Sequence, residues 1–106
     1  MVKKVEVVMK DFITNVQNWA SERGIYDYST GTAQLLKAIS EMGELADAHA
    51  KNDIPEKKDA VGDILVCLVN YCKLEGLDLA QCCESAWNEI KNRKGKMIAG
   101  GVFVKE

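Results

Sequence analysis

Four carboxylates near the middle of the sequence are spaced so that they could act together on one ligand. Glu41 and Glu44 are three residues apart, and Asp59 and Asp63 are four apart, so on helices each pair shares one face. Bare carboxylates brought together repel one another, and at least one pKa must rise. A divalent cation resolves that conflict. Oxygen donors of this kind select Mg²⁺ or Mn²⁺, which keep several waters and take substrate phosphates as further ligands.

The competing interpretation is a solvated acidic face, which is the usual role of acids at helical spacing. The position of Asp63 argues against a solvated face. Asp63 lies within the apolar stretch VGDILVCLVNYC, where burying a carboxylate without a compensating partner costs free energy. Gly43 and Gly62 also lie inside these helices, against helix propensity by about 1 kcal/mol each. We expect them to permit close approach of the two helices, and the alternative is that they clear space for a ligand.

The histidine and cysteine residues indicate no other metal chemistry. The one histidine, His49, lies five residues after Glu44, out of register with the Glu-x-x-His pattern of di-iron bundles. The four cysteines lie in apolar helical patterns without a C-x-x-C pair: Cys67, Cys72, Cys82 and Cys83. Their spacing matches neither a zinc knuckle nor a disulfide framework. We therefore expect reduced thiols in the core of a cytoplasmic protein.

Four stretches with apolar residues at helical spacing must position the carboxylates. They cover residues 9–23, 33–51, 56–75 and 79–90. A tight break at residues 52–55 makes the second and third helices antiparallel neighbours, with both acidic pairs at the same level. Residues 25–32 are expected to form a loop. On the second and fourth helices, the side chains expected to face inward are Leu35, Leu36, Ile39, Met42, Leu45 and Ala46, and then Leu79, Cys82, Cys83, Ala86, Trp87 and Ile90.

The apolar residues of the C-terminal stretch are not spaced like those of the predicted helices. Two short apolar runs flank Gly100 and Gly101, which predicts a small hairpin or an arm that packs on another subunit. An isolated two-stranded hairpin is marginal in water, so a partner surface is expected. The sequence as a whole predicts an all-α bundle of four main helices with a short C-terminal hairpin or arm, in a single domain over residues 1–106.

Composition and charge exclude several classes of function. The chain has 106 residues, with 14 basic against 16 acidic side chains and a net charge of −2, whereas a general nucleic-acid binder is normally strongly basic. An apolar run of the ~20 residues that a membrane span needs is absent from the sequence. The start, MVKKVEVVMK, is broken by Glu6 and is not expected to be a signal peptide. We therefore expect neither a nucleic-acid polymer nor a membrane as partner.

The carboxylate segments resemble a known family. The run from Gln34 to Ala48, QLLKAISEMGELADA, followed by DAVGDILV from Asp59, resembles the MazG-like all-α nucleoside triphosphate pyrophosphohydrolases. Their signature is Glu-x-x-Glu on one helix and Glu-x-x-Asp on the next. The similarity extends over nearly the whole chain, and the compact form is most similar to phage-type members. The family glutamate of Glu-x-x-Asp falls on Ala60, which leaves Asp59 as the nearby substitute.

The resemblance implies hydrolysis of a (deoxy)nucleoside triphosphate to the monophosphate and pyrophosphate, with Mg²⁺ and with Mn²⁺ as an alternative. It implies Glu41, Glu44 and Asp63 as metal ligands in the catalytic site, with Asp59 as the fourth ligand or a base that orients the water. Such an enzyme would work as a homodimer or homotetramer, as members of the family commonly do.

Phosphate charge also needs positive counterparts. Lys91, Arg93, Lys94 and Lys96 place four positive charges in six residues, although cations are favoured at a helix C-terminus in any case. The resemblance favours Lys91 and Lys94 around the phosphates, because family members use residues near the end of the fourth helix. Lys37, four residues before Glu41, is another candidate.

Other side chains could contact the nucleoside part of a substrate. Asn70 lies seven residues after Asp63 on about the same helix face, and it is either a polar contact to the ligand or a hydrogen-bonding group inside the bundle. Trp19 and Trp87 fit the apolar stripes and are expected in the core, with stacking on a base as the alternative.

Two functions of other classes remain open at this point. One is a non-catalytic regulator that binds a nucleotide without turnover. The other is a helical protein-interaction module in which the acids form a solvated face.

Overall fold

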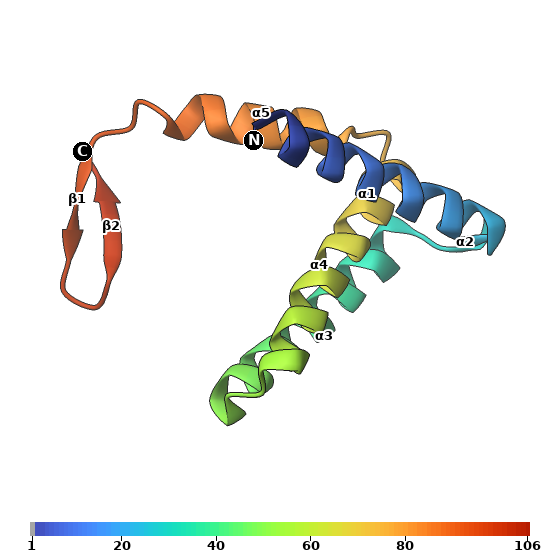
Figure 1. Ribbon diagram of the computed structural model, residues 1–106, viewed down its shortest axis with the longest axis horizontal. Helices are drawn as coiled ribbons and strands as arrows, with labels where there is room; N and C mark the ends of the chain where they lie inside the picture. Colours follow the sequence, from blue (N-terminus) through green and yellow to red (C-terminus); the bar gives the residue numbers. More distant parts are fainter. Residues whose placement is uncertain (1) are drawn as a thin grey trace.

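The computed structural model describes the backbone of residues 2–106 and the side chains of residues 8–106. Over this range it contains four long helices, one short helix and a two-stranded antiparallel hairpin (Figure 1). The elements are α1 (Val2–Glu22), α2 (Ile25–Tyr28), α3 (Gly31–Lys51), α4 (Ile54–Leu74), α5 (Leu79–Ile90), β1 (Gly95–Ile98) and β2 (Val102–Lys105). The predicted all-α fold of four main helices with a C-terminal hairpin is confirmed.

The helix boundaries follow from capping residues. Thr30, Asp53 and Asp78 precede α3, α4 and α5, and the side-chain oxygen of each accepts a hydrogen bond from the backbone amide three residues later, at 3.1–3.2 Å. Such N-caps stabilise a helix by about 1 kcal/mol each. Gly24 and Gly76 follow α1 and α4 with φ of 73° and 69°, the left-handed conformation that glycine adopts without a steric penalty.

Two elements differ from the sequence prediction. Residues 25–28 form the single turn α2 where a loop was expected, because the amides of Asp27 and Tyr28 both donate to the carbonyl of Gly24 at 3.1 and 3.0 Å. One isolated turn is too short to carry an apolar periodicity. Helix α1 begins at Val2 rather than at Met9, and the intervening sequence contains neither glycine nor proline to stop it.

The helices form an open arrangement built on one antiparallel pair. Helices α3 and α4 pack along each other as a long hairpin, while α1 and α2 pack near the C-terminal end of α4 (Figure 1). Helix α5 meets α4 near the turn that joins them and then runs away from the α3–α4 hairpin toward β1 and β2. The radius of gyration is 16.2 Å, whereas a compact chain of this length has about 13 Å.

The buried core is small and is divided between the contact of α1 with α4 and the packing of α3 against α4. Its apolar members are Val16, Ala20, Ala48, Ala60, Cys67, Val69 and Cys72. Most of these side chains are small, so this core buries little apolar surface for 106 residues. Within the part of the chain that the structure describes, no helix is both long enough and apolar enough to cross a membrane.

The expectation that α3 and α5 bury their apolar stripes within one chain is wrong. On α3, Leu36, Ile39 and Met42 are 62%, 67% and 54% exposed, and on α5 Trp87 is 58% exposed. Of the four cysteines that were expected in the core, Cys67 and Cys72 are buried while Cys82 and Cys83 are exposed. The apolar periodicity correctly identified helices, but it does not say whether the surface that covers a stripe belongs to the same chain.

The glycines inside α3 and α4 also differ from expectation. A Cβ atom added to Gly43 or Gly62 would meet no atom of the described residues within 4 Å. They therefore do not permit close approach of the two helices. They leave open space beside the carboxylates, which was the alternative interpretation.

This geometry predicts that Gly43→Ala and Gly62→Ala stabilise the fold. Alanine in a helix interior is favoured over glycine by about 0.5–1 kcal/mol, which corresponds to a rise in melting temperature of about 2–8 °C. The matched control is Gly24→Ala, where φ is 73° and the ring of Tyr28 lies 3.2 Å from the added Cβ. Thermal denaturation monitored by circular dichroism should show a higher melting temperature for Gly43→Ala and Gly62→Ala and a lower one for Gly24→Ala. A lower melting temperature for Gly43→Ala and Gly62→Ala would contradict the conclusion that space is open at these two positions.

Candidate functional site

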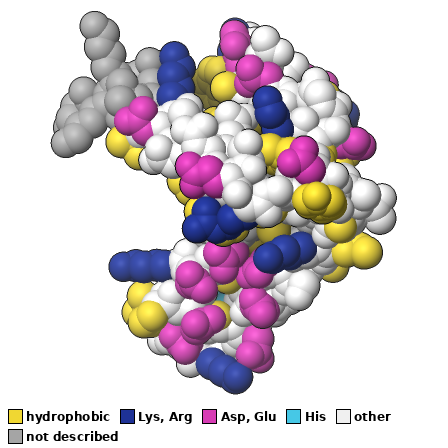
Figure 2. All heavy atoms as spheres, turned by 90° about the vertical axis from the view of Figure 1, so that its right-hand side faces the viewer, with side chains coloured by type: hydrophobic (Ala, Val, Ile, Leu, Met, Phe, Trp, Pro, Cys, Tyr) yellow, Lys and Arg dark blue, Asp and Glu magenta, His cyan; other side chains and the backbone are white. Residues whose placement is uncertain are grey.

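The four carboxylates come together across the α3–α4 hairpin. Helix α3 provides Glu41 and Glu44 and helix α4 provides Asp59 and Asp63; Glu41 lies beside Glu44, and Asp63 lies beside Asp59. The two pairs also interact across the hairpin, because Glu44 acts on Asp63 and Asp63 acts on Glu41. Figure 2 shows acidic side chains gathered over this hairpin, with lysines between them. The spacing of the acids, together with the tight break at residues 52–55, predicted this juxtaposition.

The crowding raises the pKa of two carboxyl groups. The pKa of Glu41 is raised first by the hydrogen bond that its protonated carboxyl makes with Glu44, and further by burial and by the charges of Glu44 and Asp63. The pKa of Asp63 is raised first by burial, and then by the charge and hydrogen bonding of Asp59 and the charge of Glu44. Lys37 opposes both shifts. Ionisation of this cluster therefore costs free energy.

One oxygen of the cluster is left without a partner. Oε2 of Glu41 is buried, and it accepts no hydrogen bond from any residue that the structure describes. A buried acceptor in this condition calls for an explanation such as a water or an ion. The donor set around it consists of hard carboxylate oxygens, which suit Mg²⁺ or Mn²⁺.

The residues therefore fit a divalent cation by their chemistry, although the ligand sphere is not fully assembled. Across residues 8–106, no three acidic, histidine or cysteine side chains already converge closely enough to hold an ion. The acids form two touching pairs instead. One ion held by both pairs would require their oxygens to come closer together.

Position 60 lies in the core, whereas position 59 lies beside Asp63. Ala60 is only 2% exposed and belongs to the core, so its side chain faces the packed interior. Asp59 is exposed and contacts Asp63, one helical turn away on the same face. Among the acids near position 60, Asp59 is thus the one that lies beside Asp63.

The lysine candidates separate into two groups. Lys37 lies near the acids, since its charge acts on both Glu41 and Asp63. Lys91 and Lys94 lie just beyond the C-terminal end of α5, which runs away from the α3–α4 hairpin (Figure 1). The Lys91 ammonium group donates a hydrogen bond to Asn88 at 3.1 Å. A single chain therefore does not bring Lys91 and Lys94 to its own carboxylates.

Asn70 has a partner inside the protein. Its side chain is 2% exposed, and its Oδ1 accepts a hydrogen bond of 2.7 Å from the hydroxyl of Tyr26. In a separate contact, the side-chain amide of Gln34 donates to the hydroxyl of Ser29 at 3.0 Å. Of the two roles considered for Asn70, this geometry favours an internal hydrogen bond that ties α2 to α4.

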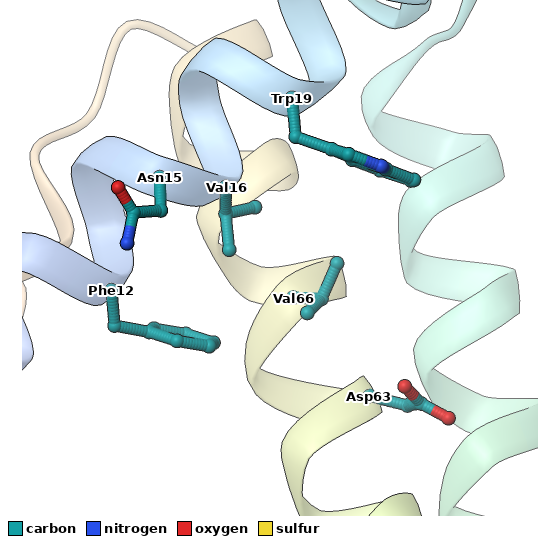
Figure 3. Close-up of a pocket in the computed structure, with 6 residues that line it drawn as sticks. All are labelled: Phe12, Asn15, Val16, Trp19, Asp63 and Val66. Carbon is teal, nitrogen blue, oxygen red and sulfur yellow. The ribbon is translucent and has the colours of Figure 1, made fainter.

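A cavity adjoins the carboxylates on the side of α1. It has a volume of about 450 Å³ and is lined by Phe12, Asn15, Val16, Trp19, Asp63 and Val66. Figure 3 shows Phe12 and Trp19 extending from α1, and Val66 and Asp63 on the neighbouring α4. The Asp63 carboxylate lies at one edge of the cavity. The Arg23 guanidinium stacks over Trp19 at 4.7 Å from the ring centroid. Most of the lining is apolar.

Sequence reasoning missed most of this cavity. Phe12 and Val16 share the apolar stripe of α1, and such a stripe looks the same whether it is packed or lines a hollow. Trp19 was expected in the core and is instead 43% exposed. Stacking on a base, the alternative considered for Trp19, was the signal in the sequence that pointed to this surface.

Comparison with known proteins supports one family. A family model described as the MazG nucleotide pyrophosphohydrolase domain matches residues 29–98, a range that includes all four carboxylates. The chain is also 34% identical over 70 residues to an uncharacterized 18.2 kDa protein in the rep-hol intergenic region of Haemophilus phage HP1. That alignment covers 66% of this chain and 43% of the phage protein, so the chain spans less than half the length of this relative. No solved structure matches the chain significantly.

Proposed function

The chain belongs to the family of MazG nucleotide pyrophosphohydrolase domains, and we propose that it hydrolyses (deoxy)nucleoside triphosphates to the monophosphate and pyrophosphate with Mg²⁺. The observation that carries the proposal is the placement of two acidic pairs on adjacent helices, with Glu44 and Asp63 near enough for their charges to interact. A triphosphate carries about four negative charges, so such a site repels it unless a cation lies between them.

The roles of the acids follow from their positions. Glu41, Glu44 and Asp63 would hold the ion, and Asp59 would complete the set or orient the attacking water. When bound, Mg²⁺ supplies charge neutralisation at the phosphates and lowers the pKa of a coordinated water. Water attacks the α-phosphorus and the bond from that phosphorus to the bridging oxygen breaks, so that pyrophosphate leaves. Lys37, beside the acids, provides a positive charge for the phosphates.

The cavity beside Asp63 is the proposed site of the nucleobase. Its volume of about 450 Å³ lies in the range of small-molecule sites. Phe12 and Trp19 offer aromatic surfaces for a base, and base–aromatic stacking contributes about 1–3 kcal/mol. Because Asp63 lies at the edge of the cavity, a base bound there leaves its phosphates directed toward the carboxylates.

We also propose that the protein works as a homo-oligomer. The exposed side chains of Leu36, Ile39 and Met42 on α3 and of Trp87 on α5 form apolar surface, and β1 and β2 add Met97, Phe103 and Val104. Large exposed apolar patches on a soluble chain mark interfaces. A second copy would bury this surface by a symmetric contact, and the small core of one chain gains stability from it.

An oligomer would also supply the missing phosphate contacts. Lys91 and Lys94 lie away from the carboxylates of their own chain. We propose that these two lysines act on the triphosphate in the site of a neighbouring subunit. Each active site would then need two chains.

The test of the function is a pyrophosphate-release assay. The full chain is incubated with a panel of ribo- and deoxynucleoside triphosphates in Mg²⁺, and then with excess chelator. We expect equal amounts of monophosphate and pyrophosphate from at least one substrate, and no release with chelator. Tight nucleotide binding without turnover would favour a non-catalytic regulator. Absence of both binding and turnover would favour a protein-interaction module.

The raised pKa values of Glu41 and Asp63 predict a pH dependence of stability. The folded state binds protons at these groups more tightly than the unfolded state, so the free energy of unfolding falls as pH rises above the ordinary values of about 4. Without divalent cation, the melting temperature should therefore decrease from pH 4 toward pH 7. Saturating Mg²⁺ should remove much of that decrease, because it binds the ionised acids of the native state.

The matched control for this pH profile is the double variant Glu41→Gln, Asp63→Asn. Its metal-free profile should be flatter than that of the wild type, and Mg²⁺ should change it little. Differential scanning fluorimetry with and without Mg²⁺ measures both. A wild-type profile that is the same in Mg²⁺ and in chelator would contradict the cation site.

A further inference from the structure

Arg23 covers one face of the Trp19 indole ring and is held there by two contacts. Its guanidinium carbon lies 4.7 Å from the centroid of the ring, and its Nη1 donates a hydrogen bond of 3.2 Å to the backbone carbonyl of Trp19. A planar guanidinium stacks on an aromatic face and is attracted to it electrostatically. Because the hydrogen bond ties the guanidinium to the residue whose ring it covers, the two groups are held together as one unit.

The opposite face of the ring is turned to the cavity beside Asp63. Trp19 is one of the residues that line this cavity, whereas Arg23 is not. Side chains of a helix lean toward its N-terminus, so Arg23, one turn after Trp19, covers the ring from the C-terminal side. Phe12 and Val16, which also line the cavity, precede Trp19 on α1 (Figure 3). The guanidinium and the cavity therefore lie on opposite sides of the indole.

The indole needs such support because much of it is in contact with solvent. Trp19 is 43% exposed, and exposed side chains change rotamer within picoseconds to nanoseconds. A side chain that must be ordered when a ligand binds reduces the affinity, whereas one that is already held in the bound orientation does not.

We propose that Arg23 is a positioning residue, which holds the Trp19 indole so that a planar base stacks on the face turned to the cavity. This rests on the proposed function, which places the nucleobase in that cavity. The layers are then guanidinium, indole and base, and Arg23 itself does not touch the substrate. Its loss would weaken binding of the base, while the carboxylates on α3 and α4 would be unchanged.

The ion pair of Arg23 offers a matched control. Nη1 of Arg23 lies 3.9 Å from Oε2 of Glu22, and the two side chains are 53% and 76% exposed. Exposed pairs of this kind contribute little to stability. Glu22→Gln removes the ion pair and leaves the stack on Trp19 in place.

The test measures binding of the four deoxynucleoside monophosphates to the full chain by isothermal titration calorimetry, since these proposed products undergo no turnover. For the one that binds most tightly, Arg23→Ala should raise Kd about two- to fivefold and Trp19→Ala about 5–100-fold. The double variant should have the Kd of Trp19→Ala alone, because Arg23 acts only through that ring. Glu22→Gln should bind like the wild type. An equal effect of Arg23→Ala with and without Trp19 would overturn the positioning role.

A second measurement needs no ligand. The chain has two tryptophans, so in a Trp87→Phe background all tryptophan fluorescence comes from Trp19. Time-resolved anisotropy should show more sub-nanosecond motion of the ring when Arg23→Ala is added, and no change with Glu22→Gln. Unchanged ring motion in Arg23→Ala would contradict the positioning role, and circular dichroism establishes that each variant is folded.

Failure of the base site and failure of the hydrolase can be told apart. If none of the four monophosphates binds the wild type, the base site and the role of Arg23 are both wrong. Release of pyrophosphate from triphosphates would still support the hydrolase in that case, because it depends on the carboxylates.

Discussion

Glu41→Gln is expected to lower kcat for pyrophosphate release by about 10²–10⁴-fold, because loss of a metal ligand removes several kcal/mol of transition-state stabilisation. Asp63→Asn should have an effect of the same order. The substitutions keep side-chain shape and remove one charge. Because the wild-type carboxylates repel one another, Glu41→Gln should melt at a higher temperature than the wild type when both are free of divalent cation. Steady-state kinetics and thermal melting on the same preparations measure the two effects.

Asp47→Asn is the matched control for this experiment. Asp47 is also an acid on α3, but it is paired with Lys51 at 2.9 Å and is exposed, and exposed pairs of this kind contribute about 0–1 kcal/mol. Its substitution should leave kcat within about twofold of the wild type. If Asp47→Asn and Glu41→Gln reduced activity equally, the acids would act as a general negative surface and not as ligands.

Asp59→Asn decides whether Asp59 replaces the family glutamate that is absent at Ala60. A metal ligand at Asp59 predicts a loss of activity comparable with that of Asp63→Asn and a higher Mg²⁺ requirement. A role in orienting water predicts a lower kcat with an unchanged Mg²⁺ requirement. Titration of activity with Mg²⁺ separates these outcomes, and full activity would exclude Asp59 from the site.

The second large effect is expected from mixing two inactive variants. The first is the double variant Lys91→Ala, Lys94→Ala. It should lower kcat/KM by about 10–100-fold per lost phosphate contact, since a hydrogen bond to a charged group contributes about 1.5–3 kcal/mol. If the lysines serve the neighbouring subunit, a heterodimer with Glu41→Gln contains one complete site. It combines the acids of one chain with the lysines of the other.

The expected recovery has a definite size. Random assembly of equal amounts gives half heterodimers, each with one intact site of two, so about one quarter of wild-type activity should return. Co-expression with two different affinity tags ensures exchange of subunits, and light scattering measures the oligomeric state. The control mixes Glu41→Gln with Asp63→Asn, which share the acid site and should yield no comparable recovery. Activity equal to the sum of the separate variants would contradict lysines acting between chains.

The sequence predicted most helix boundaries and the placement of each acidic pair on one helix face, because both depend on short-range spacing. Thr30, Asp53 and Asp78 carry capping side chains, and the three- and four-residue spacing of the acids fixes them to one face whatever the helices pack against. The turn at residues 25–28 was missed, because its hydrogen bonds to Gly24 leave no pattern in four residues.

What could not be predicted depends on which surfaces meet. Ile39 and Trp87 follow the same periodicity as truly buried residues such as Val69, and yet they are exposed in this chain. The cavity at Trp19 could not be predicted either, since a hollow between helices depends on the angle at which α1 crosses α4. The distance between α5 and the carboxylates is likewise a property of the assembled fold, and it separates Lys91 from Lys37.

The proposed cation site is tested most directly by a crystal structure of the full chain with Mn²⁺ and a non-hydrolysable deoxynucleoside triphosphate, recorded with anomalous scattering. An anomalous peak is expected within about 2.0–2.4 Å of oxygens from both helices, including Glu41, Glu44 and Asp63, and touching the triphosphate. A manganese ion bound elsewhere would contradict it, as would a triphosphate seated away from these three side chains.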